Sequence, residues 1–146
     1  MVGGTLVYAS IILLELGDLE RAEEAARGAI TELESYVLAV PTARAQLARV
    51  LVARGRIDEA IVEAEAAFAA LQKNPVDEGD ALIRLVHAEA LRAGGRTEEA
   101  RVAIRSAHAE LESRAARIAD PAARERFRRG IPDNARTIDL LGEIDR

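Results

Sequence analysis

The side chains best suited to acid–base or metal chemistry are scattered through this sequence. His87 and His108 are far apart on separate expected helices, and neither begins a His-Glu-x-x-His signature. The adjacent acids Glu23-Glu24 and Glu98-Glu99 fall in first turns of expected helices, where the helix dipole favours negative charge. Gly94-Gly95 lacks the Lys-Ser/Thr that follows a phosphate-binding loop. We therefore expect no enzyme activity, no cofactor and no metal site.

A second chemical feature is a run of basic side chains near the carboxyl end. Residues 112–131 carry six arginines against three acids, whereas the remainder of the chain is acidic. These side chains either form a solvated helix end and pair with neighbouring acids, or contact an anion through Arg124, Arg128 and Arg129. Nucleic-acid binding is disfavoured, because Phe127 is the one interleaved aromatic side chain and we expect it to anchor a helix in the core.

Composition places the chain among all-α proteins of one domain. The chain has 146 residues, 49% of them hydrophobic, and a net charge of −5. Alanine and leucine favour helices, and no alternating strand pattern is present. The absence of cysteine excludes disulfides and thiolate sites and is compatible with the cytosol, so we expect a cytoplasmic protein. The apolar run 5–14 is too short to cross a bilayer, so we expect no membrane partner.

One short pattern, Gly-polar-x-acid-x-Ala, occurs three times and organises these elements. It begins at Gly17, Gly55 and Gly95. A leucine stands four residues before each glycine, and a second alanine stands seven residues after the first. Recurrence at this spacing is typical of a helical repeat array.

Capping and breaking signals divide the chain into eight expected helices. Pro41 and Asn74-Pro75 interrupt the pattern, Thr42 is a candidate N-cap, and Asp120-Pro121 is a strong start signal. The expected helices are 6–16, 19–36, 43–53, 57–72, 78–93, 97–118, 122–129 and 132–142, with residues 1–4 preceding the first. They form a single domain, 1–146, with repeats at 5–38, 42–74 and 78–118 and a C-terminal cap at 120–144.

The repeats resemble the tetratricopeptide (TPR) family. Its motif has a small residue within the first helix of each pair, here Ser10, Ala48 and Ala88. The glycine-acid corner and the alanine pairs follow; these pairs are Ala22/Ala29, Ala60/Ala67 and Ala100/Ala107. The family's aromatic near the start of the first helix is missing, and the period is longer than the usual one. The resemblance implies a right-handed superhelix of paired helices, an α-α solenoid.

A looser resemblance concerns the segment 117–141. It is similar to the endings of TPR regions in large bacterial regulators that carry serine/threonine kinase or ATPase modules upstream. This resemblance implies that the chain is the C-terminal docking or sensing portion of a larger signalling protein. We therefore expect a non-catalytic scaffold for protein–protein interaction.

In TPR arrays the first helix of each pair lines a groove, which gives a set of expected binding residues. Outward positions are Val7, Ile11 and Leu14; Ala45, Arg49 and Val52; and Leu85, Glu89 and Arg92. Such a groove is apolar at one end and carries both charges at the other, so it suits a helix or extended peptide of mixed character. The alternative is a groove filled by a neighbouring segment of the same chain.

The first helix departs from the repeat because it is apolar on nearly every side. A helix of that kind is expected to be buried all round, yet no earlier helix covers it. Terminal repeats normally carry a polar cap. Either the chain belongs to a longer array, or it forms a homodimer through this helix.

Overall fold

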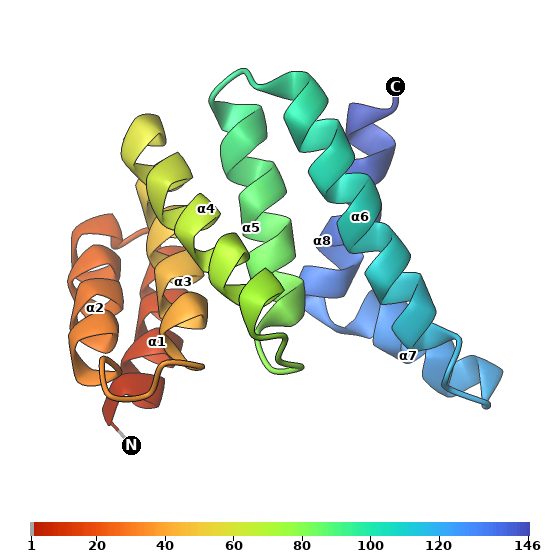
Figure 1. The fold of residues 1–146 in the computed structure, drawn as a ribbon, viewed down its shortest axis with the longest axis horizontal. Coiled ribbons are helices and arrows are strands. Elements are labelled where there is room, and N and C mark those ends of the chain that lie inside the picture. Colours follow the sequence, from red (N-terminus) through yellow and green to blue (C-terminus); the bar gives the residue numbers. More distant parts are fainter. Residues whose placement is uncertain (1) are drawn as a thin grey trace.

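The computed structural model describes residues 2–146, and this part of the chain contains helices and no strand, as predicted. Its eight helices are α1 (Val2–Glu15), α2 (Leu19–Glu32), α3 (Val40–Ala53), α4 (Ile57–Lys73), α5 (Asp80–Ala93), α6 (Thr97–Ala115), α7 (Pro121–Gly130) and α8 (Pro132–Ile144). Consecutive helices form three antiparallel hairpins, α1–α2, α3–α4 and α5–α6, that follow one another along the long axis (Figure 1). Helices α7 and α8 complete the carboxyl end.

The predicted glycine corners close all three hairpins. Gly17, Gly55 and Gly95 have φ angles of 80°, 78° and 76°, a left-handed conformation that glycine adopts without steric cost. In each corner the residue after the glycine donates its N–H at 2.9 Å to a leucine carbonyl, that of Leu13, Leu51 or Leu91. This is the Schellman closure. The recurring leucine therefore supplies the accepting carbonyl of this helix end, and the recurring glycine supplies its left-handed turn.

The hairpins pack through two layers of helices. Helix α3 contacts α1 and α5, and α5 in turn contacts α8, so α1, α3, α5 and α8 form one layer. The second helices lie against it: α2 contacts α1 and α3, α4 contacts α3 and α5, and α6 contacts α5 and α8. Helix α8 thus takes the place that a further first helix would occupy, and α7 forms the connection to it.

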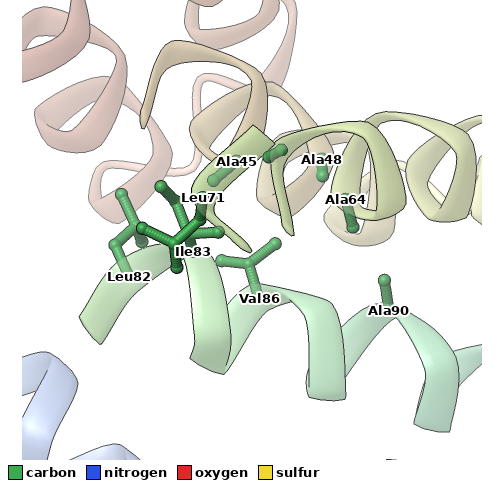
Figure 2. Packing of buried hydrophobic residues seen from close by; sticks show 9 residues of the cluster. Ala45, Ala48, Ala64, Leu71, Leu82, Ile83, Val86 and Ala90 are labelled. Atoms are coloured by element: carbon green, nitrogen blue, oxygen red, sulfur yellow. The ribbon is translucent and has the colours of Figure 1, made fainter. Parts of the chain in front are cut away.

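Small side chains allow these layers to approach closely. The alanine pairs of the corner motif are all buried, from Ala22 and Ala29 to Ala100 and Ala107. Figure 2 shows the junction of α3, α4 and α5, where Val86 and Ala90 of α5 pack with Ala64 and Leu71 of α4. An alanine seam brings helix axes together and buries the larger aliphatic side chains that flank it.

Helix boundaries differ from expectation mainly where the chain enters or leaves a hairpin. Helix α1 is helical from Val2 rather than Leu6, and its Gly3 lies against Leu33 at the end of α2, where an added Cβ would be 2.5 Å from the Leu33 Cγ. Helix α2 ends at Glu32 rather than Tyr36. Residue 1 lies outside the described residues.

Two expectations about helix starts were wrong. Helix α3 begins at Val40, so Thr42 is not its N-cap, and Pro41 lies in the first turn, where proline costs no hydrogen bond. Helix α5 begins at Asp80 rather than Glu78, because Gly79 has a left-handed φ of 85°. The predicted caps Asp18 and Asp120 are confirmed, since each accepts a backbone N–H from the helix that it begins.

Candidate functional site

The surface of the α1–α3–α5–α8 layer carries a row of ion pairs that links three helices. Arg49 of α3 donates to Glu89 of α5 at 3.1 Å and to Asp133 of α8 at 3.3 Å. Arg136 of α8 lies 3.9 Å from the other Glu89 oxygen. These side chains are partly exposed, so water screens their attraction and each pair contributes at most about 1 kcal/mol.

The row continues towards the end of α5. Glu143 of α8 accepts from Arg136 at 2.8 Å and from Arg92 at 3.3 Å. We call the six side chains of this network the charged row: Arg49, Glu89, Arg92, Asp133, Arg136 and Glu143. Acids and bases alternate along it, and half of its members come from α8.

The nine expected groove residues separate into three positions. Arg49, Glu89 and Arg92 reach the surface within the charged row. Ile11, Leu14 and Val52 are half-buried, and Ile11 and Val52 pack against buried apolar clusters. The expectation that Val7, Ala45 and Leu85 point outward was wrong: all three are buried between the layers. On their helices they lie about one turn before Ile11, Arg49 and Glu89, and they face the second layer.

The three arginines considered for anion contact all bind groups of their own chain. Arg124 donates to the Ile118 carbonyl at 2.8 Å, beyond the end of α6. Arg128 joins Glu112 of α6 to Glu125 of α7, and Arg129 donates to Asp139 of α8 at 2.8 Å. Within the described residues, the basic side chains of this region that make neither an ion pair nor a hydrogen bond are the exposed Arg117 and Arg126. The cluster thus holds α7 against α6 and α8.

The two histidines occupy unrelated environments. His87 stacks on Phe68 of α4, with ring centroids 4.4 Å apart, and its Nδ1 is buried without a hydrogen-bond partner. Burial lowers the pKa of His87 below its usual value of 6.5. His108 lies 3.5 Å from Glu112, a carboxylate that also binds Arg128.

Sequence reasoning missed two polar clusters. Ser10 donates to the Ala22 carbonyl at 2.8 Å and accepts from the Gln46 amide at 3.2 Å, which links α1, α2 and α3 in the interior. Asp80, buried at the start of α5, accepts both of its hydrogen bonds from Arg84 and lies 3.6 Å from Arg114 of α6. The i, i+4 spacing of Asp80 and Arg84 was the one signal in the sequence that could have revealed the second cluster.

A further set of ion pairs joins the hairpin corners. Arg56 bridges Glu59 in its own corner and Glu23 of α2, and Arg96 bridges Glu99 and Glu65 of α4 in the same way. Hydrogen bonds from Arg27 and Arg56 lower the pKa of Glu59. Burial acts to raise the pKa of Glu23, but hydrogen bonds from the same arginines outweigh it, and the pKa of Glu23 is lowered. The first corner has Asp18 where the others have arginine.

Helix α1 has one side that no other helix of the described residues covers. Helix α1 is covered by α2 and α3 on one side, whereas Tyr8, Ile12 and Leu16 are exposed on the other. Nearby in the chain, Tyr36, Val37 and Leu38 of the α2–α3 connection are exposed as well. The apolar surface of the molecule is therefore concentrated at its amino end.

Comparisons with protein-family models, with curated proteins and with solved structures gave no match to this chain. Across residues 2–146, no helix combines the length and the hydrophobicity needed to cross a membrane. The same residues contain no group of three or more His, Cys, Asp or Glu side chains placed to hold a metal ion.

Proposed function

We propose that this protein is a non-catalytic scaffold for protein–protein interaction, built as a TPR-like array. The array has three repeats and a C-terminal cap, and the layer of α1, α3, α5 and α8 forms its groove. The observation that carries the proposal is the charged row on the surface of α3, α5 and α8. A surface of this kind offers contacts of both charges along one direction.

The energetics of the charged row favour a partner of mixed charge. Its ion pairs are partly exposed and weak, so a peptide can exchange its own acids and bases for theirs without a large loss. Helices α3 and α5 of the groove are held in place, because each packs against two second helices. A partner helix or extended segment would therefore meet a preformed surface.

The resemblance of segment 117–141 to the endings of bacterial regulators extends this proposal. On that basis the scaffold serves as the docking or sensing portion of a larger signalling protein in the cytoplasm. The arginines of that segment then have a structural role, since Arg124, Arg128 and Arg129 bind their own chain.

Capture from a bacterial extract with wild-type and variant proteins tests the groove. The variant is Leu14→Glu combined with Arg92→Glu. Arg92 is preferable to Arg49, because Arg92 makes one ion pair within the chain whereas Arg49 makes two. The matched controls are Val62→Glu and Val102→Glu, which change exposed apolar side chains of α4 and α6.

We expect a specific partner to bind the wild type and both controls and to be lost from the groove variant. The melting temperature of each protein reports whether the fold is kept. Retention of every captured protein by a groove variant that melts like the wild type would contradict the proposal.

A further inference from the structure

The outer face of α1 is a largely apolar stripe at helical spacing, with the exposed Thr5 within it. It consists of Val2, Tyr8, Ala9, Ile12 and Leu16. Leu16 is 76% exposed and Tyr8 is 66% exposed. Among residues 2–146, seven of the ten exposed large hydrophobic side chains precede residue 39. Apolar surface gathered in this way marks an interaction site more often than scattered single residues do.

The same face of the other first helices is an internal interface. When the corner glycines are aligned, Tyr8 corresponds to Gln46 and Val86, and Ile12 corresponds to Val50 and Ala90. All four of these counterparts are fully buried. Helix α3 turns this face to α2, and α5 turns it to α4. The outer face of α1 therefore continues an established helix-packing surface without a covering helix.

The charges at the first corner distinguish this face from the internal junctions. Arg56 and Arg96 anchor their hairpins to acids of the preceding second helix. Asp18 stands at the matching position and caps α2 instead, accepting from the Arg21 N–H. The face thus keeps the apolar part of a junction and lacks its ionic part, which favours an occupant whose contact surface is equally uncharged.

The stripe is complementary to itself when two copies run antiparallel. Ala9 lies at its centre, and Val2 and Leu16 each lie seven residues away, roughly 10 Å along the helix. A two-fold axis at Ala9 places Leu16 of one copy beside Val2 of the other. The small side chain at the crossing lets the axes approach, with Tyr8 and Ile12 packed around it. No like charges meet along the stripe.

We propose that the protein forms a two-fold dimer through the outer face of α1. The contact is isologous, so the same apolar side chains of both copies are buried against each other. One helix face is smaller than the roughly 800 Å² per partner of a standard interface, so the dimer is weak and depends on concentration. This proposal is independent of the groove, because Ile11 and Leu14 lie on a different side of α1.

Sedimentation analysis over a wide concentration range tests the dimer. We expect the wild type to shift from monomer to dimer as its concentration rises. Ile12→Glu and Leu16→Glu should each weaken dimerisation about tenfold or more, since both would bury a charge. Val62→Glu and Val102→Glu are controls of similar exposure on other helices and should dimerise like the wild type. A wild type that stays monomeric at the highest concentration, or controls that lose the dimer equally, would overturn the proposal.

Cysteine cross-linking tests the antiparallel geometry, and the chain has no cysteine to interfere. Under mild oxidation by diamide, Ala9→Cys should cross-link to itself, because residues on a two-fold axis come within disulfide reach. A mixture of Val2→Cys and Leu16→Cys proteins should form the mixed disulfide in preference to either symmetric one. Efficient self-linking of Leu16→Cys, or equal linking of a Val62→Cys control, would overturn the arrangement. Because these variants leave the groove unchanged, the dimer and the proposed scaffold function fail separately.

Discussion

At the carboxyl end the last first-layer helix is tied to its neighbours by charge, whereas at the amino end α1 presents apolar side chains to solvent. Helix α8 covers Leu85 and Leu91 of α5 and contributes Asp133, Arg136 and Glu143 to the charged row. Helix α1 buries one side and leaves Tyr8, Ile12 and Leu16 uncovered. A helix stack that ends in charged side chains needs no further surface to cover it in water. Exposed apolar side chains at the other end are stabilised when a second surface covers them.

The largest expected difference comes from changing the same residue type at the two ends. Leu140 of α8 is fully buried and Leu16 is exposed. Leu140→Ala should lower the free energy of unfolding by about 2–5 kcal/mol, because it leaves a cavity between α5, α6 and α8. Leu16→Ala should change the free energy of unfolding of the monomer by less than about 0.5 kcal/mol. Urea unfolding of dilute protein measures both, and equal losses would remove the contrast between the ends.

A smaller effect is expected from Asp80, the buried acid at the start of α5. Asp80→Ala should lower the free energy of unfolding by about 2 kcal/mol, because Arg84 and Arg114 lose a partner inside the fold. Both arginines retain access to water, which keeps the loss below that of a fully buried pair. Asp77→Ala is the matched control, since Asp77 also pairs with Arg114 but is fully exposed. A loss at Asp77 as large as that at Asp80 would show that burial does not set the strength of this cluster.

The interior polar link at the amino end should contribute less. Ser10→Ala removes the hydrogen bonds to the Ala22 carbonyl and from the Gln46 amide and should cost about 1 kcal/mol. Ser106→Ala, at an exposed position of α6, is the control and should be neutral. Thermal unfolding followed by circular dichroism compares the two. If Ser10→Ala were neutral, apolar packing alone would hold α1 to its neighbours.

The smallest effect is the pH dependence that His87 gives to the middle of the molecule. Burial lowers the pKa of His87 in the folded state, so the unfolded chain takes up this proton first as pH falls. The contribution of His87 is complete above its unfolded pKa of about 6.5 and is lost as pH drops towards the folded pKa. The carboxylates with lowered pKa, Glu23 and Glu59, lose their contribution only below about 4.5.

Unfolding between pH 7.5 and 5.5 isolates this effect. The wild type should lose stability as pH falls, and His87→Phe, which keeps a ring against Phe68, should flatten that slope. Val102→Phe, at an exposed position of α6 that carries no titratable group, is the control and should leave the slope unchanged. A slope that persists in His87→Phe would place the titrating group elsewhere.

Local signals were read correctly from the sequence, and distant ones were not. The corners at Gly17, Gly55 and Gly95 were predictable, because a left-handed closure and its leucine carbonyl lie within a few residues. The start of α3 was missed, because a proline stops one helix and begins another equally well. Val7, Ala45 and Leu85 were expected to point outward and are buried instead. A small rotation of a helix about its axis decides which of its side chains face the core, and the sequence does not give that rotation.

The helices, their hairpin corners and the alanine seam could be predicted from the order of the amino acids, since each depends on backbone preferences and spacing within one or two elements. Which charges meet depends instead on how distant helices pack. Arg49 binds Asp133, eighty-four residues away, because α8 returns to the first layer beside α5. The same packing leaves one apolar side of α1 uncovered, because covering it requires a surface that the described chain does not bring to that end.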